Sequence, residues 1–255
     1  MLKVVLHFDK ALSVDKKYQL SIAFKAEIRK DLKGFYQSTY KENNETKFMG
    51  VTQFAPIGAR STFPCFDEPL FRSVFQVTII LNSNEPKITA FSNMPTKSVT
   101  TTKHGQRVFK FLPSPNMPSY LAAFVVGEFE TIEKFDLNTK FRVITTPGLK
   151  EQGKFALDTA VNVTRWLNNY FNIPYHLPKM DLVAIPDFHF GAMENWGLIT
   201  FRTLKLLRNA NTQQSDVEDI VSIVAHEIGK IFFFFLNIKS SSYVVRKFSF
   251  LFILE

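Results

Sequence analysis

Apolar and polar residues alternate along the first part of this chain, and this period of two limits its fold more than any other feature. The alternation is clearest in one run of apolar positions: Tyr18, Leu20, Ile22, Phe24, Ala26 and Ile28. Shorter strand-like runs, separated by Asn, Gly and Pro residues, follow at 73–81, 106–112, 119–129 and 140–145. Many short strands with such turns favour a β-sandwich over a parallel sheet. The sequence predicts an N-terminal β domain over residues 1–147 that lacks its first strands.

The pattern changes after Pro147-Gly148. Apolar positions at intervals of three and four predict an amphipathic helix over residues 155–171, which ends before Pro174. A short strand is expected at 181–185, and a second helix from about Asp216 to Gly229, with Ser215 and Glu218 as a capping box. Residues 148–230 therefore read as the start of an α/β domain.

Residues 231–255 form a third region with a different composition. They hold 7 of the 28 Phe residues of the chain and neither Gly nor Pro. The run at 231–235 has neither helical nor strand periodicity. No run here reaches the ~20 apolar residues that a membrane span needs.

Composition excludes several classes of protein. The net charge is +8, but Lys and Arg are scattered singly, which indicates a solvated surface and no nucleic-acid partner. The single cysteine, Cys65, rules out a disulfide framework and a cysteine zinc cluster. The first ten residues do not form a signal peptide, and no segment is a membrane span or anchor.

The second predicted helix carries a possible metal motif. His226-Glu227 begins the pattern H-E-x-x-H, in which two His residues one turn apart hold a metal and the Glu is a general base. The fifth position is Lys230, whose ammonium has no lone pair for a metal. On its own, the dipeptide His-Glu does not identify a metal site.

Three longer motifs change this interpretation. Gly191-Ala192-Met193-Glu194-Asn195 resembles the exopeptidase signature of zinc aminopeptidases of the aminopeptidase N type. Similar blocks of that family are VTQFAPIGARSTFPCFDEPLF (51–71), LPKMDLVAIPDFHFGAMENWGLITFR (177–202) and VEDIVSIVAHEIG (217–229). The resemblance implies a saddle-like β-sandwich domain followed by a truncated thermolysin-like α/β catalytic domain, and hydrolysis of N-terminal residues from peptides.

The resemblance assigns substrate-binding roles to four positions. Glu194 would bind the free α-ammonium of a peptide, because a carboxylate makes a charge-assisted hydrogen bond to an ammonium. Gly191 and Ala192 would contact the substrate through their backbone, and Gln53 would help to form the first specificity pocket. The expected partner is a peptide with a free N-terminus.

The resemblance also makes His226 a zinc ligand and Glu227 the general base, with one zinc as cofactor. The family has a second His where this chain has Lys230 and a Glu where it has Ser249. A catalytic zinc needs three protein ligands and a water, so zinc binding by this chain is doubtful and we expect it to be inactive. His189 is a conceivable substitute ligand that its spacing does not support.

The origin of residues 231–255 has two readings. Gly229-Lys230 can be encoded by a splice-donor sequence, so the tail could be translated intron in a gene-model error, or it could belong to a genuine isoform. In the second case the chain is an alternative, non-catalytic peptide- or partner-binding module. Two glycosylation patterns, at Asn44 and Asn162, favour a secreted or cell-surface parent.

Overall fold

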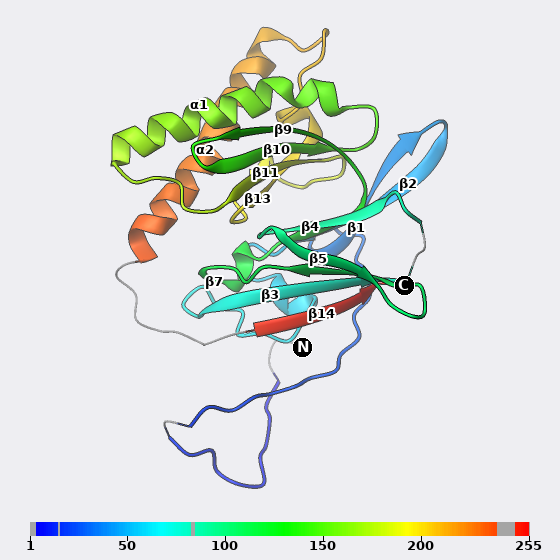
Figure 1. The fold of residues 1–255 in the computed structure, drawn as a ribbon, viewed down its shortest axis with the longest axis vertical. Helices are drawn as coiled ribbons and strands as arrows, with labels where there is room; N and C mark the ends of the chain where they lie inside the picture. Colours follow the sequence, from blue (N-terminus) through cyan, green and yellow to red (C-terminus); the bar gives the residue numbers. More distant parts are fainter. Residues whose placement is uncertain (1–3, 15, 83–84, 239–247, 255) are drawn as a thin grey trace.

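In the part of the chain that the structure describes, the strands form three sheets, and two long helices accompany one of them (Figure 1). The computed structural model describes residues 4–14, 16–82, 85–238 and 248–254. The sheets lie in layers, with the N-terminal residues extending below them as a loop without strands (Figure 1). A single hydrophobic cluster includes buried residues from all three sheets and both helices.

The first sheet is antiparallel. Its strands in spatial order are β1 (Gly34–Glu42), β2 (Glu45–Gln53), β8 (Phe124–Glu128) and β4 (Ile88–Ser92). Asn43 and Asn44 connect β1 and β2 with positive φ angles of 48° and 67°. Two such residues form the tight turn whose twist matches a β-hairpin.

The second sheet contains the last strand of the chain. Its spatial order is β14 (Phe248–Leu254), β3 (Arg72–Leu81), β6 (Arg107–Phe111) and β5 (Thr96–Thr101), and β7 (Asn116–Pro118) also pairs with β3. β14 runs parallel to β3, with Phe250 opposite Val77. Buried and half-buried residues alternate along β3, as the period of two predicts.

Aromatic rings fill the space between these two sheets. Phe124 of β8 lies 4.9 Å from Phe35 of β1 and 4.7 Å from Phe252 of β14, measured between ring centroids. Phe250 and Phe252 are buried, whereas Leu251 and Ile253 are exposed. The two sheets therefore form the predicted sandwich, to which β14 contributes one face of a strand.

The third sheet is mixed and carries the helices. Its order is β12 (Ala192–Met193), β13 (Leu198–Arg202), β11 (Lys179–Ile185), β10 (Thr139–Thr145) and β9 (Glu130–Asp136), with β10, β11 and β13 parallel. Helix α1 (Lys154–Phe171) covers one face of this sheet, away from the sandwich (Figure 1). β9 and β10 precede residue 147, so this sheet crosses the predicted boundary; the division into domains stays a prediction.

The α/β arrangement confirms the predicted fold class, and the first helix lies where its periodicity predicts. The prediction for the second helix is wrong at both ends, because α2 extends over Gln214–Ile238. Ser215 lies inside the helix and not at its cap. Beyond Gly229 the buried positions Ile231 and Phe232 continue the apolar stripe of Ile228. This burial offsets the cost of about 1 kcal/mol for a glycine within a helix.

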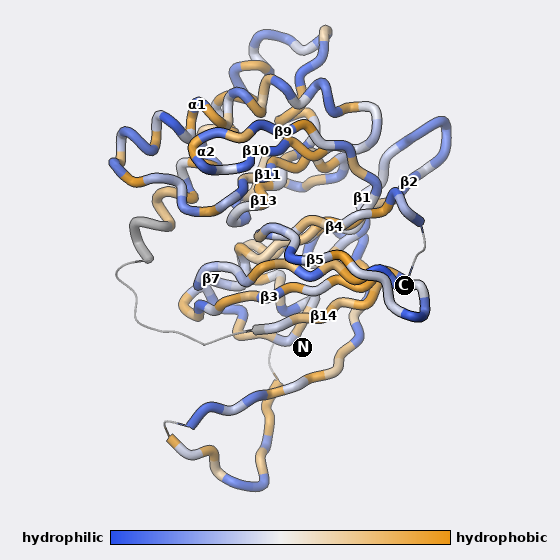
Figure 2. Tube along the Cα trace, in the orientation of Figure 1, coloured by the Kyte–Doolittle hydropathy of each residue, from blue (hydrophilic) through white to orange (hydrophobic). Residues whose placement is uncertain are grey.

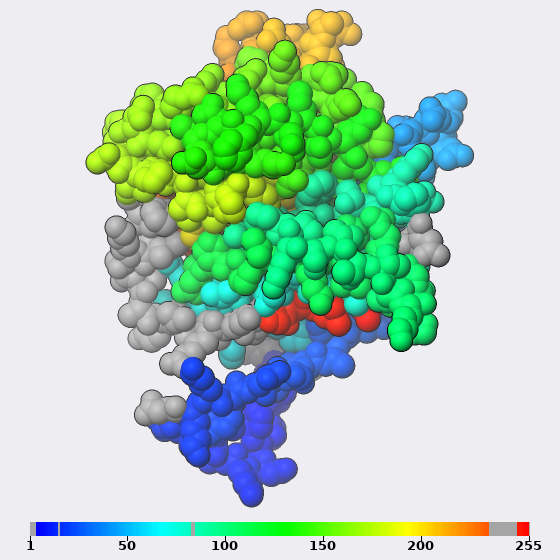
Figure 3. Space-filling model, viewed as in Figure 1, coloured from blue at the N-terminus to red at the C-terminus, as the bar shows by residue number. Residues whose placement is uncertain are grey.

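The predicted strand at 18–28 is also wrong. Residues 16–28 contain no strand, and Leu20 and Ile22 are 58% and 46% exposed. A strand needs a hydrogen-bonded neighbour, and residues 16–28 pair with none of the three sheets. Hydropathy varies along this segment, which projects from the body of the molecule (Figures 2 and 3).

Candidate active site

Glu194 lies in a short loop between β12 and β13 that is held on two sides. Gly191 accepts a hydrogen bond of 2.9 Å through its carbonyl oxygen from the backbone nitrogen of Arg202. The Arg202 guanidinium donates to the carbonyl oxygens of Phe188 and His189. These bonds fix the segment that leads into the loop, in which Gly191 and Ala192 are half-buried.

The far side of the loop is held by two side chains from different parts of the fold. Asn93, which follows β4 of the sandwich, donates from Nδ2 to the carbonyl oxygen of Trp196 at 2.9 Å. Lys179 at the start of β11 donates from Nζ to the carbonyl oxygen of Gly197 at 2.6 Å. The sandwich and the α/β sheet thus meet at the loop that carries Glu194.

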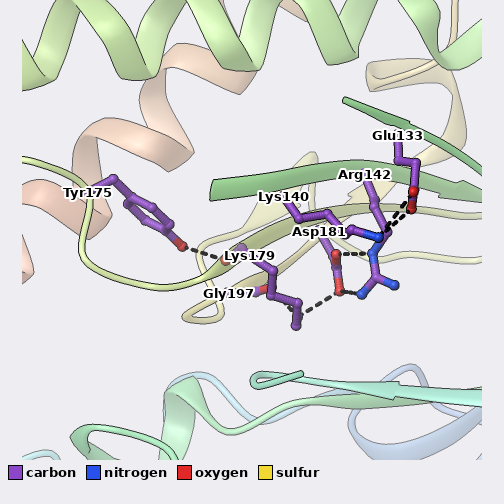
Figure 4. Close-up of polar contacts among 7 residues, drawn as sticks. All are labelled: Glu133, Lys140, Arg142, Tyr175, Lys179, Asp181 and Gly197. Carbon is purple, nitrogen blue, oxygen red and sulfur yellow. Dashed lines mark hydrogen bonds and ion pairs between the residues drawn. The ribbon is translucent and has the colours of Figure 1, made fainter. Parts of the chain in front are cut away.

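Lys179 belongs to a buried charged cluster (Figure 4). Its Nζ atom lies 2.6 Å from Oδ2 of Asp181, and Arg142 binds both oxygens of the same carboxylate, at 2.7 and 2.8 Å. Burial lowers the pKa of Lys179 to about 8, and the negative charge of Asp181 opposes this change. Two cations on one carboxylate satisfy its oxygens, as a buried charge requires.

Glu194 has an ammonium beside it. Oε2 of Glu194 lies 3.3 Å from Nζ of Lys230, and the two side chains are 19% and 43% exposed. Both line a pocket of about 270 Å³, and its other lining residues are Tyr120, Leu121, Trp196, Ile231, Phe233 and Phe234. The helix past Gly229 therefore forms one wall of this pocket, and a turn of the sandwich forms another.

Glu227 lies one turn before Lys230 on α2 and is only 4% exposed. Burial raises the pKa of Glu227 to about 7; the positive charge of Lys230 acts against this rise and the carboxylate of Glu194 adds to it. Its Oε2 atom has no hydrogen-bond partner among the described residues. A carboxyl group with a pKa near neutrality can accept or donate a proton at physiological pH.

His226 is exposed, whereas the next residue, Glu227, is buried. Within the described ranges, no group of three or more His, Cys, Asp or Glu side chains could hold a metal ion. Lys230 brings a cation to the place where the motif needs a second His, and Ser249 lies in β14, paired with Gln76 of the sandwich. The side chains that the structure describes around His226 do not fit a catalytic zinc site.

Gln53 and His189 are the remaining predicted residues. Gln53 ends β2 and is 2% exposed, and neither polar atom of its amide has a partner in the described part of the chain. His189 is exposed and lies against Phe190. The structure brings Glu194, Glu227 and Lys230 together and does not bring His189 into this group.

Sequence reasoning missed the walls of the pocket. Tyr120 comes from the turn before β8, and Trp196 is buried and in edge contact with Phe234, with their centroids 5.5 Å apart. No periodicity or spacing links these residues, because they come from three separate segments. The sequence offered a signal only for Trp196, which directly follows Glu194 and Asn195 and could therefore be expected near the site.

This chain has a β-sandwich followed by an α/β sheet, and a Glu-containing loop of that sheet lies beside a His-Glu helix. This arrangement is expected of the aminopeptidase class. Residues 2–121 match the model of the peptidase M1 N-terminal domain, and residues 155–233 match that of the peptidase family M1 domain. The chain belongs to peptidase family M1.

Several curated proteins are similar over most of this chain. A puromycin-sensitive aminopeptidase of Caenorhabditis elegans is 45% identical over 222 residues, which are 86% of this chain and 23% of the relative. Aminopeptidase M1-A of rice is 40% identical, with 90% of this chain and 26% of the relative covered. Bovine aminopeptidase N is 37% identical, with 90% and 24% covered.

The chain thus spans about a quarter of the length of these relatives. The activity of a whole relative is therefore a matter of proposal for this chain. Among the helices that the structure describes, none is both long enough and apolar enough to cross a membrane.

Proposed function

We propose that this chain is part of a zinc metalloaminopeptidase and that it keeps the amine-binding half of the site without the metal-binding half. In this proposal Glu194 binds the free α-ammonium of a peptide, and Gly191, Ala192 and Gln53 contact its first residue. Glu227 is the residue that would act as general base, and His226 is the one remaining zinc ligand.

One contact carries the proposal. The ammonium of Lys230 lies 3.3 Å from the Glu194 carboxylate at the edge of an aromatic pocket. A half-buried carboxylate that already has a primary ammonium as its partner is suited to the ammonium of a peptide. The amide of Gln53 has no partner among the described residues, but Gln53 does not line this pocket, so its substrate role rests on the resemblance alone.

We propose that this chain has no aminopeptidase activity. Lys230 and Ser249 stand where the resemblance implies a second and a third zinc ligand, and a lone His cannot hold a catalytic zinc. The test is an assay of the pure chain with added zinc and an aminoacyl substrate that releases a chromophore. No turnover is expected; turnover that the Glu227→Gln variant loses would contradict the proposal.

The second candidate is a non-catalytic module that binds peptides or a partner subunit. The observation in its favour is that residues 248–254 form a strand of the sandwich, so part of the tail belongs to the fold. Binding of a peptide with a free N-terminus, but not of its acetylated form, would support this candidate. A soluble protein with a single cooperative melting transition is its prerequisite.

The location of the parent protein at the cell surface or outside the cell remains a proposal. It depends on the two glycosylation patterns, and both acceptor residues, Asn44 and Asn162, are exposed. Treatment of the protein from its native source with a glycosidase that removes Asn-linked sugars should lower its apparent mass. An unchanged mass would count against this location.

A further inference from the structure

The pocket at Glu194 carries two opposite charges side by side. Glu194 supplies a carboxylate and Lys230 an ammonium, and Tyr120 is the other titratable residue in its lining. Both charged side chains are partly exposed to solvent. An ion pair of this kind contributes little to stability, because water screens it and both side chains lose freedom in forming it. It can therefore open for a ligand at low cost.

A ligand with one ammonium and one carboxylate on the same carbon atom matches this pair. Its ammonium would bind Glu194 and its carboxylate would bind Lys230, so one internal pair is exchanged for two charge-assisted interactions. An α-amino acid has these two groups on one carbon atom. A peptide has only the ammonium at that position, because an uncharged amide replaces the carboxylate.

The size and the walls of the pocket favour a single residue. Its volume of about 270 Å³ lies below the roughly 300–1,000 Å³ of sites for drug-sized ligands. Its wall at Phe234 is held from two sides, by the edge contact with Trp196 and by the Arg72 guanidinium 5.1 Å from the ring centroid. Aromatic walls in fixed positions favour an apolar, and above all an aromatic, ligand side chain.

We propose that this pocket binds a free aromatic α-amino acid as its zwitterion, with the ammonium on Glu194 and the carboxylate on Lys230. This inference rests on the proposed function for the role of Glu194 and adds the role of Lys230. Lys230 stands where the motif has a metal-binding His, and its ammonium instead recognises the carboxylate of the bound amino acid.

The test is calorimetric titration of the full chain with three probes. L-Phenylalanine has both charges, L-phenylalaninamide only the ammonium, and N-acetyl-L-phenylalanine only the carboxylate. L-Phenylalanine is expected to bind at least about tenfold more tightly than either of the other two, because each of them lacks one charge-assisted contact.

Two variants separate the two halves of the site. Lys230→Met should remove the preference for L-phenylalanine over its amide, whereas Glu194→Gln should weaken binding of both. Lys205→Met is the matched control, because Lys205 pairs with Asp219 of α2 at 2.6 Å and does not line the pocket. Melting temperatures of the three variants should stay close to that of the unchanged chain, since each removes one side of a partly exposed ion pair.

The outcomes distinguish this inference from the proposed function. If the amide binds as tightly as L-phenylalanine and Glu194→Gln abolishes both, the zwitterion site is wrong and the amine site stands. If none of the three probes binds, both the zwitterion site and the amine-binding role of Glu194 are wrong. If Lys205→Met changes the affinity for L-phenylalanine as much as Lys230→Met does, the effect is one of general charge and the inference is overturned.

Discussion

The side-chain amide of Asn93 donates a hydrogen bond of 2.9 Å to the carbonyl oxygen of Trp196 and so joins the sandwich to the loop of Glu194. The same nitrogen donates to the carbonyl oxygen of Leu121 at 2.8 Å, and the side-chain oxygen accepts from the backbone nitrogen of Ala123 at 2.7 Å. Asn93 is 3% exposed, so these backbone groups have no access to water as a substitute. One buried amide therefore fixes three segments.

Replacement of this amide should destabilise the whole chain. Asn93→Leu leaves the partners of three hydrogen bonds unpaired in the interior, at a cost of about 1–3 kcal/mol for each group. Urea denaturation followed by circular dichroism should show a loss of at least about 2 kcal/mol in the free energy of unfolding. Asn169→Leu, at an exposed position of α1, is the control and should stay within about 0.5 kcal/mol. Equal losses for the two variants would contradict the role of Asn93.

Replacement of Gly197 by Ala should lower stability through a steric clash in addition to backbone strain. Gly197 and Gly148 have φ angles of +82° and +81°, so Ala is strained at both. A Cβ atom at Gly197 would clash with the backbone oxygen of Asn93, whereas at Gly148 nothing lies within 4 Å. Gly148→Ala should cost about 1 kcal/mol from strain, and Gly197→Ala clearly more. Melting temperatures of the two variants, measured together, provide the check, and a similar fall in both would exclude the clash.

The buried Lys179 predicts a pH dependence of stability. Burial lowers the pKa of Lys179 to about 8 in the folded chain, while the unfolded chain keeps a pKa of about 10.4. Above pH 8 the Lys179 side chain therefore holds more protons in the unfolded state than in the folded state. This residue by itself raises the free energy of unfolding with pH by up to about 1.4 kcal/mol per unit. Burial also raises the pKa of Cys65 to about 12 and raises the pKa values of Tyr36 and Tyr175. The ionisation of these groups on unfolding opposes the rise, from about pH 8.5 for Cys65 and from about pH 10 for the tyrosines.

The measurement for Lys179 is urea denaturation at several pH values between 8 and about 9.5, where the tyrosines stay protonated in both states. The unchanged chain should become more stable over this interval relative to the Lys179→Met variant. The comparison uses the change with pH and not the absolute difference, because the variant also loses the contact with Asp181. Parallel curves for the two proteins would show that Lys179 does not release its proton in this range.

The last strand should contribute to the core of the sandwich. Phe252 is 7% exposed and Leu251 is 55% exposed, although they are neighbours in β14. Phe252→Ala should cost about 3–5 kcal/mol, as for other buried aromatic side chains, and Leu251→Ala should cost about 0.5 kcal/mol or less. Chemical denaturation of both variants makes the comparison. Two equally small losses would mean that β14 does not pack on Phe124.

Local sequence was sufficient to predict a helix or strand where the element's own residues decide its structure. The spacing of apolar residues predicted α1, and alternation predicted β3, because each pattern matches the repeat of one element and requires only one covered face. The same alternation at residues 18–28 failed. The pattern describes which face of a strand could be buried but not whether a neighbouring strand is available.

The candidate site likewise has residues that the sequence identifies and contacts that only the tertiary structure decides. The residues around Glu194 and Glu227 mark the family through their order along the chain, so a single sequence was enough to single them out. The pairing of Glu194 with Lys230 and the aromatic pocket required tertiary structure. The continuation of α2 past Gly229 turns Lys230 towards a loop that lies far away in the sequence. Local periodicity contains no information on such a contact, because the packing of α2 against the sheet and the sandwich decides it.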